Sequence, residues 1–521
     1  MENVDVVIVG SGAAGSLFAA HLAQKSKKVV ILEAGPERAM GDLFSSQIWS
    51  RRLKWGGPPT DSAGKDPLSV NFASGWGTGG SALHHYANWF RLHPEDFEMQ
   101  TRFERGLDWP FSYDELRPFY DRIQTEVGIS GDAKKEVWRP AGAPYPMPPL
   151  QSFAQGQLIA RGFDKLGLRT SPLPMAINSV AYQGRAACVY DGWCDAGCPI
   201  SALANPLAIY LLQALKAGAT IRHRSFVTRV LTRTAGDRAT GVEYFDAEGR
   251  RQVQEASVVV LAAYAFQIPR LLLNSRPGGL ANSSGLVGRY MMGHAGGNVF
   301  GLFKEDTQNY LGMTGGQLLS QESYAKDPAK GFLAASQWMI GNALKPNDLL
   351  GIVNARPDLF GNELHDFLRT AGKHLATMTF LGEALPNPDN RLVLTSGKDQ
   401  YGLPLARVTH DFGPDDIKCF EAGMKQGQDI FKAAGAYEVW AGGRVRIHTM
   451  GGAIMGRSPE TSVTNGYGQA HDIPNLFLAG SSLFPTSGGV NPTFTIHALA
   501  LRSAEYVIRN WSDLTVKHSA A

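Results

Sequence analysis

The sequence is short of cysteine, of long apolar runs and of charge of one sign. Its 521 residues include 4 cysteines, too few for a disulfide-bonded scaffold. The longest apolar run, residues 258–266, falls far short of the about 20 residues that a transmembrane helix needs. Lys and Arg number 50 against 47 Asp and Glu, a formal net charge of +3 without a basic block, which argues against nucleic acid as the main partner.

The start of the sequence also lacks the pattern of a secretory signal. Acidic residues Glu2 and Asp5 stand where a basic region would be, and the apolar stretch 6–9 runs directly into a glycine motif. We therefore expect either a cytoplasmic protein or one that is exported in folded form with the help of another polypeptide.

The composition is that of a globular protein with more than one domain. Hydrophobic residues make up 44% of the chain and charged residues 19%, and the length exceeds what one core supports. Glycine is abundant, with 59 residues, and much of it lies in short runs beside apolar segments. This pattern indicates backbone that packs closely against a ligand.

The first 33 residues have the pattern of a β-α-β dinucleotide-binding unit. An apolar strand at 4–9 is followed by the motif GSGAAG at 10–15, a helical stretch and a second apolar strand at 29–32. Glu33 ends the second strand at the distance that such units require. This context makes the motif specific for a dinucleotide, although it does not separate FAD from NAD.

Each glycine of the motif has an expected physical role. Gly10 permits a tight turn, Gly12 lets the backbone approach a pyrophosphate, and Gly15 allows close packing of the helix. The helix N terminus then faces the phosphates with free N–H groups and its positive dipole end. Glu33 would accept hydrogen bonds from the hydroxyls of the adenosine ribose.

The rest of the chain alternates helical and strand patterns, which predicts an α/β protein. The expected elements are a loop-rich stretch at 36–72, a helix after the capping box of Ser112 and Glu115, a helix over 205–216, a β-meander over 223–261, strands within 387–409, a helix over 414–433, a strand at 475–480 and a helix from 492 to about 510.

Four later segments, together with the N-terminal motif, resemble the glucose–methanol–choline (GMC) oxidoreductase family. They are GGSALHHYANWFR at 79–91, VVVLAAYAFQIPRLLL at 258–273, HTMGGAIMG at 448–456 and the stretch 475–500, and they occur in the family's order. The resemblance implies a Rossmann-like FAD-binding domain built from residues 1–95, 202–300 and 436–511. It also implies a sheet-based substrate domain at 96–201 and 301–435, an arrangement like that of p-hydroxybenzoate hydroxylase.

The resemblance also implies where FAD would be held. Pyrophosphate and ribose contacts fall on Gly10, Gly12, Gly15 and Glu33, and the adenine contact falls on the backbone of Val227. Contacts to the flavin edge fall on Gly80, Ser81, His85, Asn491, Pro492 and Thr493, with further cofactor contacts at Ala14, Ala34, Gly79, His84, Ala262, Gly480 and Ser481. One family member carries its flavin covalently on a histidine at the position of His84, so the resemblance allows a covalent bond there. The alternative is a neutral His84 packed on the flavin ring.

Oxidation of an alcohol requires removal of a hydroxyl proton and of a hydride from carbon. A flavin takes the hydride, and histidine is the simplest base near neutral pH. By resemblance, His448 is this base, and Asn491 binds the same substrate oxygen and stabilises the developing alkoxide. Asn491 precedes Pro492 at a helix start, so it could instead be a structural cap. His497, inside that helix, is interpreted as a packing residue.

Three of the cysteines lie within eleven residues, at Cys188, Cys194 and Cys198, with Pro199 directly after them. Soft thiolates in a short loop favour an iron–sulfur cluster or zinc, and three of them suit a 3Fe-4S cluster. Cys419 is interpreted as a small buried residue. Structural zinc, or one disulfide with a free thiol, are the alternatives.

This loop at 188–198 resembles that of the catalytic subunits of bacterial FAD-dependent sugar dehydrogenases, the FAD glucose dehydrogenase and glucoside 3-dehydrogenase group. The resemblance implies oxidation of a sugar or glycoside ring hydroxyl to a keto sugar or lactone, with electrons passing through the 3Fe-4S cluster to an external acceptor. It further implies a small subunit that carries the export signal, a cytochrome c partner, and a periplasmic or membrane-associated location. Two alternatives remain: a flavin oxidase that uses oxygen, with structural cysteines, and a flavin-binding electron-transfer subunit without substrate turnover.

Overall fold

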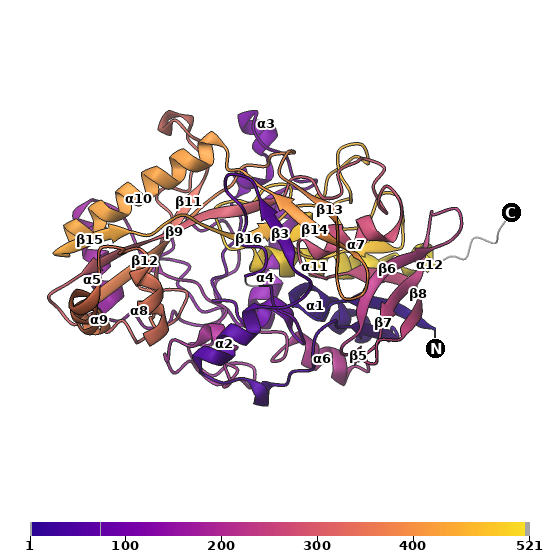
Figure 1. The fold of residues 1–521 in the computed structure, drawn as a ribbon, viewed down its shortest axis with the longest axis horizontal. Coiled ribbons are helices and arrows are strands. Elements are labelled where there is room, and N and C mark those ends of the chain that lie inside the picture. Colours follow the sequence, from indigo (N-terminus) through magenta and orange to yellow (C-terminus); the bar gives the residue numbers. More distant parts are fainter. Residues whose placement is uncertain (1–2, 73, 516–521) are drawn as a thin grey trace.

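Two seven-stranded sheets organise the chain and lie toward opposite ends of its longest axis (Figure 1). The computed structural model describes residues 3–72 and 74–515. Residues 1, 2 and 73 of the predicted segment 1–95, Glu2 among them, lie outside the described residues. The predicted α/β fold class, with a Rossmann-like sheet and a second sheet-based part, is confirmed.

The first sheet contains the dinucleotide-binding unit. Its order is β5-β2-β1-β8-β7-β6, with β17 beside β8. β1 and β2 are apolar and pair in parallel, because α1 (Ala13–Ala23) crosses between them. β6, β7 and β8 form the predicted antiparallel meander. The strands are β1 (Val4–Val9), β2 (Val29–Leu32), β5 (Thr220–Arg222), β6 (Phe226–Thr232), β7 (Ala239–Phe245), β8 (Arg251–Leu261) and β17 (Leu476–Leu478).

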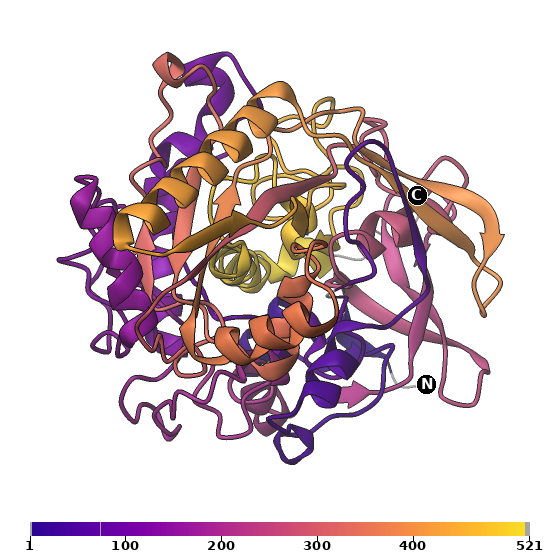
Figure 2. The same cartoon turned by 60° about the vertical axis from the view of Figure 1, so that its left-hand side comes forward.

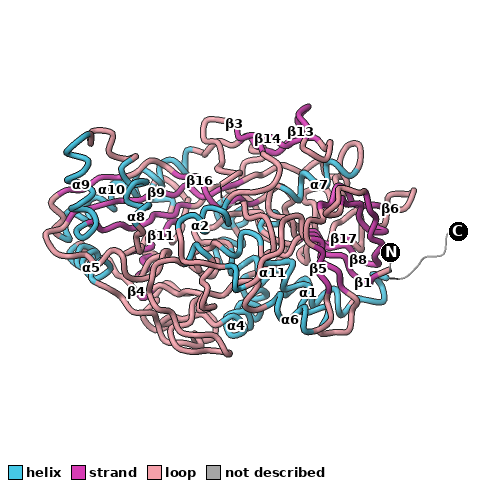
Figure 3. Tube along the Cα trace, turned by 60° about the horizontal axis from the view of Figure 1, so that its bottom comes forward, coloured by secondary structure: helices cyan, strands magenta, loops and turns pink. Residues whose placement is uncertain are grey.

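A layer of helices covers this sheet (Figure 3). α11 (Thr493–Arg509) packs against α1 and α4 (Tyr113–Val127), and α1 also contacts α6 (Tyr210–Lys216). The predicted capping box of Ser112 and Glu115 starts α4. α6 begins five residues later than predicted, because Asn205 closes a separate turn: its Oδ1 accepts a hydrogen bond from the N–H of Ala208 at 3.0 Å. α7 (Gln267–Ser275) and α12 (Trp511–Thr515) complete this region.

The second sheet is antiparallel throughout and has the order β15-β9-β12-β11-β10-β4, with β16 also paired to β9. Its strands are β4 (Ser171–Pro172), β9 (Met292–Leu302), β10 (Leu318–Ser320), β11 (Ser336–Ile340), β12 (Leu375–Gly382), β15 (Glu438–Ala441) and β16 (Val445–Met450). The predicted segments 202–300 and 436–511 of the first domain contain most of β9 and all of β15 and β16. The domain boundaries themselves stay a prediction.

A long helix, α10 (Pro414–Ala434), lies along the second sheet and against α5 (Ala154–Lys165) (Figures 1 and 2). It begins where predicted, because Pro414 fits the first turn and the carboxylate of Asp416 accepts the N–H of Gly413 at 2.8 Å. Glycine at position 423 lets the helix approach the sheet, since a Cβ there would lie 2.2 Å from the ring of Phe380.

The stretch 36–72 is loop-rich, as predicted, but it also contains an α-helix and a β-strand that the sequence analysis did not name. This stretch contains α2 (Gln47–Lys54), capped by the hydroxyl of Ser46, and β3 (Thr60–Ala63). β3 pairs with β14 (Pro404–Thr409), which pairs with β13 (Arg391–Lys398). A four-residue polar strand becomes regular only when its distant partner is in place, so its own sequence gives no strand signal.

Three further helices lie in the described chain: α3 (Met99–Phe103), α8 (Pro346–Val353) and α9 (Gly361–His374). Within residues 3–72 and 74–515, no helix combines the length and the apolar character needed to cross a bilayer.

Candidate active site

A cavity of about 420 Å³ extends from the glycine loop after β1 to the N terminus of α11. Nearly all of the predicted cofactor-binding residues line it, and so does the predicted base, His448. Gly15 and Gly79 are the predicted cofactor residues that do not reach its wall. The predicted residues that line the cavity are Gly10, Gly12, Ala14, Glu33, Ala34, Gly80, Ser81, His84, His85, Val227, Ala262, Gly480, Ser481, Asn491, Pro492 and Thr493.

The glycine loop has the geometry expected of a pyrophosphate cradle. Gly10 has a φ of +99°, and a Cβ there would lie 2.6 Å from the carbonyl oxygen of Ala262. A Cβ at Gly15 would lie 2.0 Å from the carbonyl oxygen of Gly10. The expected conformational reasons for glycine at 10 and 15 are therefore confirmed. At Gly12, the cap of α1, the nearest atom to a Cβ is 3.9 Å away, which leaves room for a ligand at the helix N terminus.

The Glu33 carboxylate links three chain segments by hydrogen bonds at the predicted nucleotide end of the cavity. It accepts hydrogen bonds from the backbone N–H and hydroxyl of Ser11, at 3.1 and 2.6 Å, and from the N–H groups of Gly35 and Gly77, at 2.9 and 3.2 Å. Glu33 lines the cavity and is 6% exposed. Its contact with a ribose stays a prediction.

The flavin end of the cavity contains two neighbouring histidines in different states. The ring of His85 is fully engaged: Nε2 donates to the carbonyl of Ala204 at 2.7 Å, and Nδ1 accepts from the N–H of Ala87 at 3.2 Å. His84 lines the same cavity, but its buried Nε2 has no hydrogen-bond partner among the residues that the structure describes. Burial, and next the charge of Lys54, lower the pKa of His84 to about 3, so the ring is neutral.

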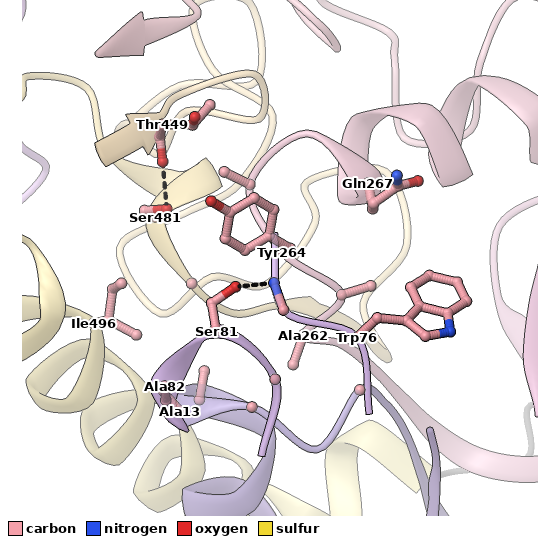
Figure 4. Close-up of a pocket in the computed structure, with 18 of the residues that line it drawn as sticks. Ala13, Trp76, Ser81, Ala82, Ala262, Tyr264, Gln267, Thr449, Ser481 and Ile496 are labelled. Carbon is pink, nitrogen blue, oxygen red and sulfur yellow. Dashed lines mark hydrogen bonds between the residues drawn. The ribbon is translucent and has the colours of Figure 1, made fainter. Parts of the chain in front are cut away.

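Figure 4 shows how three segments meet in this part of the cavity. Ser81 accepts the N–H of Gly75 at 2.8 Å, and the hydroxyl of Ser481 donates to the carbonyl of Thr449 at 2.8 Å. The phenol ring of Tyr264 lies between these two sides, and its backbone has a φ of +77°. Strained backbone of this kind is common where a chain is shaped around a ligand.

The observations fit an FAD. A helix N terminus with an open approach at Gly12 suits the pyrophosphate, and the orphaned Nε2 of buried His84 is a polar atom that a bound ring system would meet. The residues at the cavity wall would hold the dinucleotide along its whole length.

His448 and Asn491 come together at the flavin end. Nδ2 of Asn491 lies 3.4 Å from Nε2 of His448, and Nδ1 of His448 lies 3.0 Å from Nδ1 of His294. His294 is fully buried on β9 and lies behind His448, outside the cavity wall. The sequence analysis missed His294, because nothing in its small-residue strand marks it as functional.

The local backbone explains this meeting. β16 pairs with β9 so that Ile447 is opposite His294, and the register then shifts between Ile447 and Met450. His448, inside this bulge, has a φ of +59°. An undisturbed strand would direct residue 448 to the other face of the sheet, so the bulge is what places its ring beside His294.

The interpretation of Asn491 as a helix cap is wrong. α11 has Pro492 at its cap position, and no side chain caps it. The amide of Asn491 instead contacts His448 and accepts a hydrogen bond from Nε2 of Gln337 at 3.3 Å. His497 is a packing residue, as predicted: its Nδ1 donates to the carbonyl of Thr493 at 2.8 Å, and its ring lies 4.5 Å from that of Trp89.

The three cysteines of the loop are close to one another but are not assembled as a metal site. In the described chain, no group of three or more His, Cys, Asp or Glu side chains is arranged to hold a metal ion, and all four cysteines are free thiols. The sulfurs of Cys188 and Cys198 accept backbone N–H bonds at 3.3 and 3.4 Å. Burial, and next the charge of Cys188, raise the pKa of Cys194 to about 12.

Cys419 lies apart from this loop, on α10. It is 1% exposed, and burial raises the pKa of its thiol to about 12. Its interpretation as a small buried residue is confirmed.

A buried ion pair joins the cysteine loop to the cavity. Nζ of Lys54, which lines the cavity, lies 2.5 Å from the carboxylate of Asp195, the residue after Cys194. Lys345 lies 3.5 Å from the same carboxylate. No sequence pattern indicates this contact, because its partners lie more than a hundred residues apart.

Comparisons with known proteins agree with this geometry. Residues 4–295 and 386–500 match the two parts of the GMC oxidoreductase family. The large subunit of fructose dehydrogenase from Gluconobacter japonicus is 31% identical, covering 98% of each chain. The 2-methyl-1,2-propanediol dehydrogenase of Mycolicibacterium austroafricanum is 32% identical, covering 98% of this chain and 96% of its own. A solved formate oxidase structure has a TM-score of 0.70 at 16% identity, covering 98% of this chain and 99% of its own.

The chain therefore belongs to the GMC oxidoreductase family. The predicted resemblance to this family, and within it to subunits of bacterial sugar dehydrogenases, is confirmed. The family binds FAD, and the chain is an oxidoreductase that acts on CH–OH donors of the alcohol and sugar type.

Proposed function

We propose that this chain is a FAD-dependent dehydrogenase that oxidises a ring hydroxyl of a sugar or glycoside to a keto sugar or lactone. The observation that carries the proposal is the contact of His448 with Asn491 at the wall of the predicted cofactor cavity. The similarity to a fructose dehydrogenase large subunit supports a sugar as the substrate.

The open side of the cavity also suits a sugar ring. Phe72 and Tyr86 line it and are 38% and 42% exposed, so their rings are available to the apolar faces of a bound molecule. Nζ of Lys54 lies 5.9 and 5.8 Å from the two ring centres and adds a polar group for hydroxyls.

The chemistry divides between cofactor and protein. When bound, FAD supplies the acceptor for the hydride that leaves the substrate carbon. Nε2 of His448 takes the hydroxyl proton, and the amide N–H of Asn491 donates a hydrogen bond to the substrate oxygen as its negative charge develops.

The dependence of this step on pH follows from the state of His448. Burial, and next the neighbouring His294, hold the pKa of His448 well below its usual value of 6.5. The base acts only in its neutral form, so the rate is retained at neutral and mildly acidic pH and is lost only as the pH falls through the lowered pKa. We expect kcat/KM for flavin reduction to be flat between about pH 6 and pH 8. Anaerobic stopped-flow measurements check this, and a fall centred near pH 6.5 would contradict it.

His84 is the proposed position of a covalent flavin bond. Its unpaired Nε2 supports the proposal, whereas both ring nitrogens of His85 are engaged by backbone. Acid precipitation separates the alternatives: a covalent flavin stays with the polypeptide, and a neutral His84 that only packs on the ring releases free FAD.

We further propose that Cys188, Cys194 and Cys198 hold a 3Fe-4S cluster through which electrons leave to an external acceptor. The spacing of the three thiols along the chain supports this. Cluster binding would require the thiols to ionise and converge. We expect about three iron atoms and about four acid-labile sulfide atoms per chain. Zinc alone, or neither metal, would overturn the proposed cluster.

We also propose that the chain works with other subunits, a small one that carries the export signal and a cytochrome c, and that it is periplasmic or membrane-associated through them. The name of the fructose dehydrogenase relative, a large subunit, supports an assembly. Purification of the native complex from its source, with identification of co-purifying chains, tests this.

The decisive experiment is anaerobic bleaching of the flavin absorbance across a panel of sugars, glycosides and small diols. We expect rapid bleaching by a sugar or glycoside and reoxidation by a dye or cytochrome rather than by oxygen. Bleaching by small diols alone would reject the sugar assignment. Rapid oxygen consumption with formation of hydrogen peroxide would favour the alternative, a GMC-type flavin oxidase with structural cysteines, whose fold is also that of the formate oxidase.

A further inference from the structure

We infer that His294 is a positioning residue that fixes the tautomer of His448, so that Nε2 of His448 carries the lone pair that accepts the substrate proton. The inference rests on the proposed role of His448 as the base. It goes beyond that role, because it states which ring nitrogen acts and which buried group decides it.

The argument starts from a carbonyl group. Nε2 of His294 lies 2.8 Å from the carbonyl oxygen of Gly488. A carbonyl only accepts hydrogen bonds, so Nε2 of His294 carries the proton. Burial lowers the pKa of His294 to about 4, which makes the ring neutral at physiological pH. The other nitrogen of a neutral ring, Nδ1 of His294, is then an acceptor.

The proton position on His294 also determines the proton position on His448. Nδ1 of His448 lies 3.0 Å from Nδ1 of His294. Because the His294 nitrogen is an acceptor, Nδ1 of His448 must be the donor and carry the proton. The ring of His448 is also neutral, so its Nε2 is left with a free lone pair at the cavity wall.

A second chain of hydrogen bonds reaches the same nitrogen from the opposite side. Nε2 of Gln321 donates to Oε1 of Gln337 at 2.9 Å, and Nε2 of Gln337 donates to Oδ1 of Asn491 at 3.3 Å. The amide nitrogen of Asn491 is thus the end that faces Nε2 of His448. An amide N–H opposite a ring nitrogen requires an acceptor there, so both chains assign the lone pair to Nε2.

The carbonyl that starts the first chain is held rigidly. Gly488 has a φ of +59°, and a Cβ there would lie 2.3 Å from the side chain of Leu92. The N–H of Gly489 donates to the hydroxyl of Tyr324 at 3.0 Å, and that hydroxyl donates to the carboxylate of Asp96 at 2.7 Å. The acceptor for His294 therefore does not depend on a mobile loop.

The arrangement also serves the proton after its transfer. Once Nε2 of His448 has gained the substrate proton, the ring is an imidazolium whose Nδ1–H still donates to Nδ1 of His294, so the positive charge is shared with a second ring. Asp96 is the charged group whose field acts on His294 from behind, and Lys326 and Glu383 pack against Asp96. The hydrogen bond to His294 thus keeps the ring of His448 in one orientation before and after the proton transfer.

Two variants of His294 distinguish loss of the hydrogen-bond acceptor from loss of side-chain packing. His294→Leu has a similar volume but no acceptor, and we expect flavin reduction to slow about 10- to 100-fold with little change in KM. His294→Asn places an amide oxygen near the position of Nδ1 and is expected to keep the rate within about threefold of the parent. Equal losses in both variants, or none in His294→Leu, would overturn the inference.

A readout without turnover is the ¹⁵N spectrum of the histidines in the intact holoenzyme, with the His448 signals identified by their absence in His448→Ala. We expect the parent protein and His294→Asn to show a protonated Nδ1 and an unprotonated Nε2 at His448. In His294→Leu, mixed tautomers are expected. An unprotonated Nδ1 in the parent would overturn the inference even if His294→Leu does not fold. Unchanged activity of His448→Ala would overturn the proposed function instead, whatever the tautomer.

Discussion

His448→Ala is expected to slow flavin reduction by substrate about 100- to 10,000-fold while the protein keeps its FAD. The variant removes the ring whose Nε2 contacts the amide of Asn491 and is argued to accept the substrate proton. The cofactor should stay bound, because its predicted contacts extend over the whole cavity and few depend on residue 448. Anaerobic single-turnover reduction, with the flavin content measured on the same sample, checks both statements.

The matched control is His365→Ala. His365 is exposed on α9, in an element that contributes nothing to the cavity, so its loss should leave the rate unchanged. Unchanged activity of the whole complex with His448→Ala would favour the other alternative, an electron-transfer subunit without substrate turnover. A loss of FAD with the loss of rate would show instead that His448 is needed to hold the cofactor.

Lys326→Met is expected to lower the free energy of unfolding by about 3–5 kcal/mol. Lys326 is fully buried between two carboxylates: its Nζ lies 3.0 Å from Asp96 and also contacts Glu383. Removing the cation leaves two negative groups in the core without a partner. One of them, Asp96, also accepts the hydroxyl of Tyr324, and that hydroxyl accepts the N–H of Gly489. Urea titration of the holoenzyme measures the change.

The loss of stability in Lys326→Met should also depend on pH in a definite direction. Burial raises the pKa of Glu383 even with the lysine present, and loss of the lysine raises it further. When the pKa of a carboxyl is higher in the folded than in the unfolded protein, the group does not lower the free energy of unfolding at low pH. It lowers that free energy progressively as the pH rises from the unfolded pKa to the folded pKa. The deficit of Lys326→Met is therefore expected to be larger at pH 8 than at pH 5, and a deficit independent of pH would contradict the assignment.

The control for this variant is Lys425→Met. Lys425 is exposed and pairs with Asp429 along the surface of α10, 3.0 Å away. Exposed pairs of this kind contribute about 1 kcal/mol or less, so stability should hardly change. Adding Glu383→Gln to Lys326→Met should recover part of the loss, because it removes one of the two unpaired charges.

Local patterns predicted the cofactor end of the protein well. The glycine motif, the two apolar strands and Glu33 lie within a short stretch, and each depends on neighbours a few residues away. The capping box at Ser112 and the start of α10 at Pro414 are likewise decided by side chains three residues apart.

Prediction from sequence was weaker where regular structure needs a distant partner. The strand at Thr60–Ala63 is polar and short, and it exists because Pro404–Thr409 lies beside it. The delayed start of α6 follows from a hydrogen bond of Asn205 to the carbonyl of Gly197, on a loop whose course the sequence does not reveal.

By itself, the sequence predicted a dinucleotide-binding unit, because its glycine motif and flanking strands are set by near neighbours, and the family resemblance pointed to His448 and Asn491 as the reactive pair. Only the tertiary structure decided which residues contact that pair from within the protein. His294 and Gln337 each lie 154 residues from the partner they contact, and a bulge in one strand brings the rings together. Contacts of this kind depend on strand register and chain packing, which act over the whole fold and leave no local signal.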